Sequence, residues 1–100
     1  MIVIHKATVA MGNSLLSSVP PTLLPHDAKP LAARMQNRTL CVWYETDNRL
    51  DAVGLVRRVR VVGTGESAPA RFESDYVETV LDGPYVWHVY LDAPEVDGAA

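Results

Sequence analysis

The stretch Y-V-E-T-V-L-D-G-P-Y-V-W-H-V-Y-L, from Tyr76 to Leu91, decides the fold class of this chain. Two runs of β-branched and aromatic residues flank Asp82-Gly83-Pro84, and this pattern is typical of a β-hairpin with its turn. Pro84 has no N–H with which to close a two-residue Asp-Gly loop. We therefore expect a three-residue loop that is closed by Leu81 and Tyr85.

This register predicts which side chains share a face of the hairpin, because residues opposite each other lie on the same side of the sheet. The face expected to meet the core pairs Leu81 with Tyr85, Thr79 with Trp87 and Val77 with Val89. The other face pairs Val80 with Val86, Glu78 with His88 and Tyr76 with Tyr90. This second face is expected to gather a carboxylate, an imidazole and two phenols.

The rest of the chain also predicts an all-β fold. Strands are expected at Ile2–Val9, Thr39–Thr46 and Val53–Val62, because β-branched and aromatic residues alternate there with other side chains. Lys29–Gln36 has the composition of a helix but alternates like a strand, and we favour the strand. Turn signals roughly every ten residues predict a small antiparallel barrel or sandwich of five to seven strands.

Prolines and glycines mark the connections between these strands. Four prolines exclude a regular helix from residues 20–30, where we expect a surface connection pinned by Leu23 and Leu24. Leu15–Val19 is a candidate for a short strand, and Glu66–Asp75 is a polar loop with room for one helical turn. Residues 1–92 are expected to form a single β domain, followed by a flexible C-terminal tail at residues 93–100.

Composition restricts the classes of function. The chain has 100 residues and a net charge of −3, which argues against general affinity for nucleic acid. Arg57, Arg58 and Arg60 form a basic cluster, for which solubilising charge on an exposed or edge strand is a simpler explanation than an anion site. No signal peptide or membrane-spanning segment is recognisable, so we expect a cytoplasmic protein without a membrane partner.

No segment matches a catalytic or cofactor motif, so we predict neither cofactor nor metal nor enzymatic activity. Cys41 is the single cysteine and lies in the middle of a predicted strand, where such a residue is usually packed rather than reactive. The histidines at positions 5, 26 and 88 lack the close spacing of a metal site. Gly63-Thr64-Gly65 lacks the phosphate-binding pattern and is better explained as a turn that ends a strand.

Three blocks carry a resemblance to a known family. They are T-L-C-V-W at 39–43, V-V-G-T-G at 61–65 and V-L-D-G-P-Y-V-W-H-V-Y at 80–90. The chain resembles a family of small proteins of tailed bacteriophages and prophages, which carry L-C-L-W, I-V-G-T-G and V-Q-D-G-P-F-V-W-H-V-F. It departs from that family at Asn37-Arg38, where Asn-Gly is frequent, and in a longer, proline-rich stretch at 12–27. The resemblance implies a compact β protein that acts in the host cytoplasm, and it implies no activity.

These observations favour a non-catalytic bacteriophage accessory protein that binds a host protein or itself and so interferes with host physiology or defence. The candidate binding residues are Tyr76, Glu78, His88, Tyr90, Arg58 and Arg60. One alternative is a protein that binds a small ligand or nucleotide in a pocket near His88. Another alternative is a minor structural or assembly component of the phage particle.

Overall fold

The computed structural model describes residues 1–9, 21–47, 55–68 and 74–96, and every regular element among them is a β-strand. The strands are β1 (Ile2–Val9), β2 (Thr22–Pro25), β3 (Lys29–Gln36), β4 (Thr39–Asp47), β5 (Leu55–Gly63), β6 (Ser74–Asp82), β7 (Tyr85–Asp92) and β8 (Glu95–Val96). The predicted all-β class is therefore confirmed. In this part of the chain, no helix is long and apolar enough to cross a membrane.

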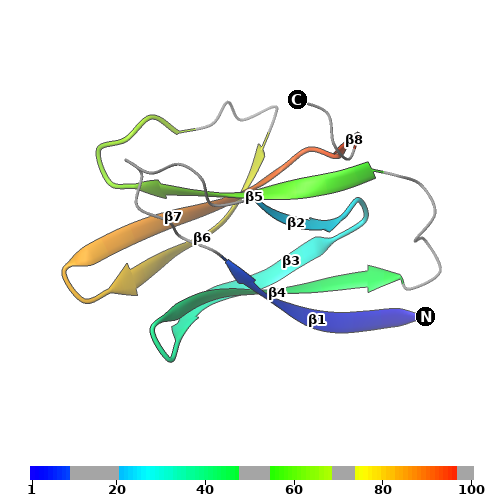
Figure 1. Cartoon of the computed structure of the whole chain (residues 1–100), viewed down its shortest axis with the longest axis horizontal. Helices are drawn as coiled ribbons and strands as arrows, with labels where there is room; N and C mark the ends of the chain where they lie inside the picture. The colour runs from blue at the N-terminus through cyan, green and yellow to red at the C-terminus, as the bar shows by residue number, and fades with distance from the viewer. Residues whose placement is uncertain (10–20, 48–54, 69–73, 97–100) are drawn as a thin grey trace.

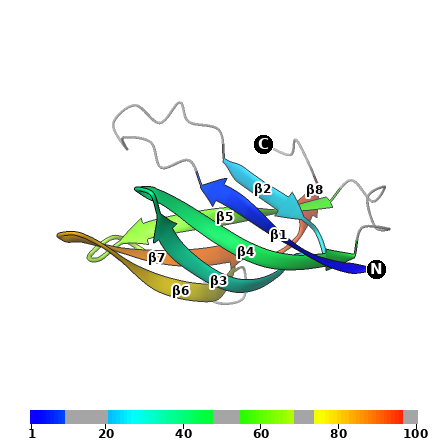
Figure 2. The same cartoon turned by 90° about the horizontal axis from the view of Figure 1, so that it is seen from below.

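The strands form two antiparallel sheets that pack face to face as a sandwich rather than closing into a barrel (Figure 1, Figure 2). The three-stranded sheet has the order β1-β4-β3. The five-stranded sheet has the order β2-β5-β7-β6, and β8 also pairs with β5. At one side of the sandwich β3 lies beside β6, and at the other side β1 approaches β2.

The predicted strands at Ile2–Val9 and Lys29–Gln36 are confirmed with the same bounds. Lys29–Gln36 becomes a strand because it pairs with β4 across a turn at Asn37 and Arg38, whose φ angles are 51° and 65°. Positive φ at both central residues defines a type I′ turn, which matches the twist of the flanking strands. The candidate strand at Leu15–Val19 lies outside the described residues, as does part of the loop at Glu66–Asp75.

Two short strands were not predicted, and they bring the number of strands in the described ranges to eight. The proline-rich connection contains β2, in which Leu24 is buried and Leu23 is exposed. The segment expected to be a flexible tail contains β8, which pairs Glu95 with Val56. Both are brief pairings with β5, for which the sequence has no alternating run long enough to indicate a strand.

The register of the β6–β7 hairpin differs from the predicted one by one residue. Asp82 pairs with Tyr85, so the loop consists of Gly83 and Pro84 alone. Gly83 has a φ of 56°, and a glycine with positive φ at the first central position is typical of a type II′ turn. Pro84 occupies the second central position, where the turn requires no N–H from it. The expected closure at Leu81 and Tyr85 is therefore wrong.

This shift moves most of β6 to the opposite face from the one predicted. Val80 pairs with Trp87 and is 4% exposed, whereas Leu81 pairs with Val86 and is 74% exposed. The predicted pair of Glu78 with His88 is also wrong, because Thr79 lies opposite His88. Val77 forms a β-bulge, and beyond the bulge the predicted pairing of Tyr76 with Tyr90 is restored.

The core lies between the sheets and draws on nearly every strand. Its buried members are Val9, Leu24, Ala28, Ala33, Leu40, Val42, Val59, Val80, Val89 and Leu91. In β4 the predicted alternation holds, since Leu40, Val42 and Tyr44 point inward. Burial of such aliphatic side chains stabilises the fold by roughly 1.5–3 kcal/mol for each large one.

Arg57 is the one charged side chain of β5 that points toward the core. Its Nε donates to the carbonyl of Asp92 at 2.7 Å, and its Nη1 donates to the carbonyl of Ala28 at 2.9 Å. Its Nη2 pairs with the carboxylate of Asp75 at 3.0 Å. Arg57 thus joins β5 to β7, to β6 and to the turn after β2, and solubilising charge is the wrong interpretation for it.

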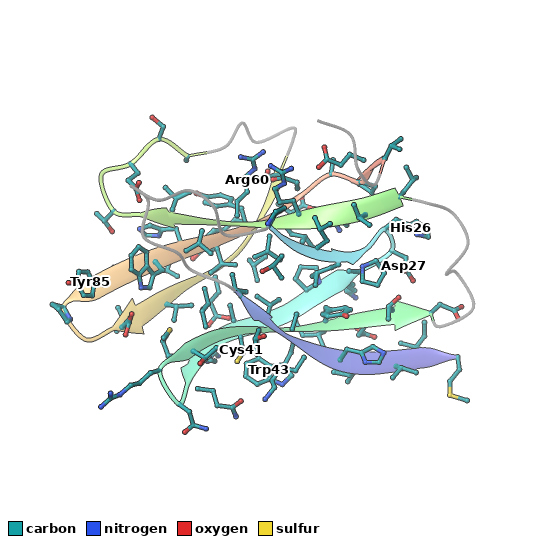
Figure 3. All side chains as sticks on the ribbon, viewed as in Figure 1. His26, Asp27, Cys41, Trp43, Arg60 and Tyr85 are labelled. Carbon is teal, nitrogen blue, oxygen red and sulfur yellow. The ribbon has the colours of Figure 1, made fainter. Side chains whose placement is uncertain are left out.

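The turn between β2 and β3 carries the chain from one sheet to the other, and Asp27 fastens it to β4 (Figure 3). The backbone N–H of Asp47 donates to Asp27 Oδ2 at 2.8 Å, and the Thr46 hydroxyl donates to Asp27 Oδ1 at 2.6 Å. These two bonds hold the pKa of Asp27 below its ordinary value of 3.8.

We predict that Asp27→Asn lowers the free energy of unfolding by about 1 kcal/mol at pH 7, because an amide cannot accept both bonds as well as a carboxylate. The folded-state pKa of Asp27 lies below the unfolded one. Its contribution is therefore complete above pH ~4 and is lost as the pH falls through the folded-state pKa.

Urea denaturation of both proteins at pH 7 and at pH ~3 measures this difference. The stability gap between wild type and variant should shrink at the lower pH. A gap that stays constant over this range would contradict the assigned role of Asp27.

Candidate functional site

The outer face of the five-stranded sheet, which points away from the three-stranded sheet, carries most of the predicted binding residues. Figure 3 shows Arg60 on this side of β5, whereas Cys41 and Trp43 belong to the opposite sheet. We call this surface the tyrosine face. It consists of Tyr76, Thr79, Leu81, Val86, His88 and Tyr90 from the β6–β7 hairpin, with Arg60 and Val62 from β5.

Tyr76 and Tyr90 form the aromatic centre of the tyrosine face. They lie directly opposite each other, and their rings meet edge to face with centroids 5.7 Å apart. Tyr76 is 57% exposed, and Tyr90 is partly covered between Tyr76 and Arg60. The predicted proximity of the two phenols is therefore confirmed.

A chain of hydrogen bonds extends from Tyr76 across the tyrosine face to the turn after β5. The Tyr76 hydroxyl bonds the Thr79 hydroxyl at 2.5 Å, and Thr79 bonds His88 Nδ1 at 3.0 Å. His88 Nε2 bonds the Thr64 hydroxyl at 2.9 Å. Hydroxyl groups thus occupy both ring nitrogens and fix the ring. Among the described residues, no carboxylate hydrogen-bonds this imidazole in the way that one does in a hydrolytic triad.

Glu78 is a predicted site residue that does not lie on the tyrosine face. It lies opposite Val89 on the inner side of β6, where the two sheets meet beside β3. Its Oε1 accepts the backbone N–H of Ala33 at 3.0 Å, and its Oε2 pairs with the guanidinium of Arg34. Glu78 therefore covers an edge of the three-stranded sheet. It takes no part in an acid–base pair with His88.

Arg58 and Arg60 lie on the outer face, but nearby carboxylates offset their charge. Arg60 Nε donates to both oxygens of Asp92, at 2.7 and 2.9 Å, and Asp92 also accepts the hydroxyl of Ser74. Arg58 lies 3.8 Å from the carboxylate of Glu95. The pair therefore forms no uncompensated cationic patch.

A shallow groove lies beside the tyrosine face, between β5 and the segment that follows it. It has a volume of about 430 Å³ and is lined by Arg60, Val61, Val62, Ser67 and Ala68. The groove is open to solvent, and Glu66 next to it accepts the backbone N–H of Gly63 at 2.5 Å. Small-molecule sites are usually enclosed and largely apolar, so this groove lacks the features of a ligand pocket.

Two further chemical candidates of the sequence are a reactive cysteine and a metal site. Cys41 is buried on the outer side of β4, as expected for a packed cysteine. The register places it beneath a hydrogen bond of 2.7 Å between Lys6 and Gln36. In the ranges that the structure describes, no cluster of three or more His, Cys, Asp or Glu side chains has a metal-binding arrangement.

Sequence reasoning missed one exposed aromatic group at the tip of the hairpin. Tyr85 was expected in the core but is exposed at one end of the molecule (Figure 3). Its ring stacks on that of Trp87 with centroids 5.8 Å apart, and Trp87 Nε1 donates to Asp82 at 3.0 Å. The choice of register does not supply a signal for this exposure, because Tyr85 closes the loop in both the predicted and the observed register.

Comparison with known proteins identifies a family for the chain. Residues 1–99 match the model of a domain of unknown function, DUF7352, and the chain belongs to that family. No curated protein and no solved structure matches it.

We predict that Glu78→Ala speeds amide hydrogen exchange at Ala33 by about tenfold, because the variant removes the acceptor of that N–H. Exchange at each residue is measured by NMR. Glu45→Ala is the matched control, since Glu45 lies on β4 and has no described contact with Ala33. An unchanged exchange rate at Ala33 in Glu78→Ala would contradict the structural role assigned to Glu78.

Proposed function

We propose that this member of the DUF7352 family is a non-catalytic accessory protein of a bacteriophage, and that it binds a host protein through the tyrosine face. Binding would take place in the host cytoplasm and interfere with host physiology or defence. The observation that carries the proposal is the exposure of Tyr76 and Leu81, 57% and 74%, next to the Tyr90 ring on the tyrosine face.

The tyrosine face has the chemistry of a protein-binding surface. Tyr76 and Leu81 are large side chains that are mostly exposed, although both belong to regular strands. Tyrosine contributes strongly to interfaces because it buries a large area while losing the freedom of only two torsion angles. The bonds from Tyr76 through Thr79 to His88 hold the ring in place before binding, which reduces the entropy lost on association.

Charge and shape favour a protein over the alternative partners. Asp92 and Glu95 offset the charges of Arg60 and Arg58, so nothing on this face concentrates the positive charge that a nucleotide or nucleic acid needs. The groove beside Arg60 is open, whereas small ligands usually bind in enclosed sites. A small-ligand function therefore ranks below protein binding.

The phage assignment rests on the sequence blocks that resemble proteins of tailed bacteriophages. Two of these blocks meet at the tyrosine face, because Thr64 of the V-V-G-T-G block bonds His88 of the block that ends in V-W-H-V-Y. The third block, which includes Cys41 and Trp43, belongs to the other sheet. The block that supports the resemblance best, with D-G-P and W-H in fixed order, thus lies in the hairpin that carries most of the tyrosine face.

The test is site-specific photo-crosslinking in the host bacterium. A benzoylphenylalanine at position 76 should give one dominant covalent adduct with a host protein. The same probe at Thr8, an exposed position on the opposite sheet, should give no adduct with a host protein. Adding Leu81→Glu to the position-76 probe should reduce adduct yield about tenfold or more, because a carboxylate opposes burial of this face.

The Leu81→Glu change is expected to leave thermal stability nearly unchanged, since the side chain it replaces is exposed. Equal labelling from positions 76 and 8, or an adduct that is indifferent to Leu81→Glu, would contradict the proposal. An adduct formed only with a second copy of the chain would assign the tyrosine face to self-association instead.

A further inference from the structure

Edge strands carry unpaired backbone groups, and natural proteins usually protect them with proline, bulges, charge or short length. Of the four edge strands longer than two residues in the described part of this chain, three have such protection. In the three-stranded sheet, β3 has Pro30, a bulge after it, and Glu78 on the N–H of Ala33. In the five-stranded sheet, β2 has four residues and ends at Pro25, and β6 has a bulge at Val77.

The fourth edge, β1, lacks these devices. It is eight residues long, contains neither proline nor glycine, and pairs with β4 without a break in register. Ile2 and Ile4 both lie on its outer face and are 62% and 61% exposed. Charges stand only at the two ends of this stretch: the Met1 ammonium pairs with Asp47 of β4 at 3.0 Å, and the Lys6 amine bonds Gln36 on the far strand of the same sheet. The first half of β1 is therefore an apolar edge whose outward backbone groups can pair with another strand.

We propose that a second copy of this chain pairs with β1, so that two three-stranded sheets join edge to edge across a two-fold axis at Val3. The pairing is antiparallel and sets Val3 against Val3 of the second copy and Ile2 against Ile4 of the second copy. The four isoleucines then form one apolar cluster on the outer face. Each is exposed in the single chain, so the cluster exists only in the pair.

The first three residues of β1 are complementary to themselves in an antiparallel pair. This favours a second copy of the chain as the partner and defines one register. Opposite residues share a face, so a two-fold axis must pass through a residue rather than between two residues. An axis at Ile4 sets Ile2 against Lys6, and an axis at Lys6 sets two lysines against each other, which is destabilising. Only the axis at Val3 pairs every isoleucine with an isoleucine, and I-V-I is symmetric about that residue.

The dimer has two further expected properties. A single short edge buries less than the roughly 800 Å² per partner of a typical stable complex. The pair is therefore expected to dissociate in the micromolar-to-millimolar range. The tyrosine face lies on the other sheet, so pairing through β1 leaves it open. The inference is thus independent of the proposed function.

Sedimentation equilibrium of the full chain with a C-terminal tag tests the proposal. The wild-type chain should dimerise reversibly with concentration. Ile2→Lys with Ile4→Lys should raise the dissociation constant at least about tenfold, because it sets lysines against lysines. Ile2→Glu with Ile4→Lys should restore it to near the wild-type value, because each glutamate then faces a lysine of the second copy. Tyr76→Ser, on the other sheet, is the control and should leave the dissociation constant of the dimer unchanged.

This charge exchange restores the dimer only in the proposed register. A chain that stays monomeric up to ~1 mM overturns the proposal, as does a dimer that resists the lysine pair or is not rescued by the glutamate–lysine pair. A mixture of labelled and unlabelled wild-type chains gives a second measurement without any substitution. It should show intermolecular NMR contacts between the methyl groups of Ile2 and Ile4, and their absence in the dimer would also overturn the proposal.

Discussion

A proline has no N–H for a β-ladder, so Pro84 must lie either inside the hairpin loop or at its unpaired margin. The structure places it inside a two-residue turn with Gly83, whose positive φ the turn requires. This placement fixes the register of β6 against β7. The register in turn sends Val80 to the core, Leu81 to solvent and Glu78 to the contact between the sheets. This one turn therefore decides which side chains of β6 are exposed on the outer face of the hairpin.

Two charged residues then hold the sandwich closed where the sheets meet. Arg57 satisfies the carbonyls of Ala28 and Asp92 from within, and Glu78 satisfies the N–H of Ala33 at the edge of β3. Buried backbone groups without partners would be costly, so these contacts make a core of modest size sufficient. In the described part of the chain, the tyrosine face and the first half of β1 lack contacts of this kind. These are the two surfaces for which we propose partners.

The sequence predicts strand positions well because alternation and β-branching are local signals. Lys29–Gln36 shows this, since its strand pattern outweighed its helical composition. Register is less predictable, because two loops around Pro84 satisfy proline equally well and differ by one residue. This one-residue difference in loop length decides whether Glu78 lies opposite His88 or accepts the N–H of Ala33. The roles of Arg57 and Asp27 were also beyond prediction, since both depend on contacts between segments far apart in sequence.

The most direct test of this account is the pattern of cross-strand nuclear Overhauser effects in the wild-type hairpin. The account predicts contacts that link Thr79 with His88 and Glu78 with Val89. Contacts that link Glu78 with His88 would contradict it, because they require the three-residue loop and return Glu78 to the tyrosine face. The contact between Tyr76 and Tyr90 occurs in both registers. Only contacts of the residues between the bulge and the turn therefore distinguish the two registers.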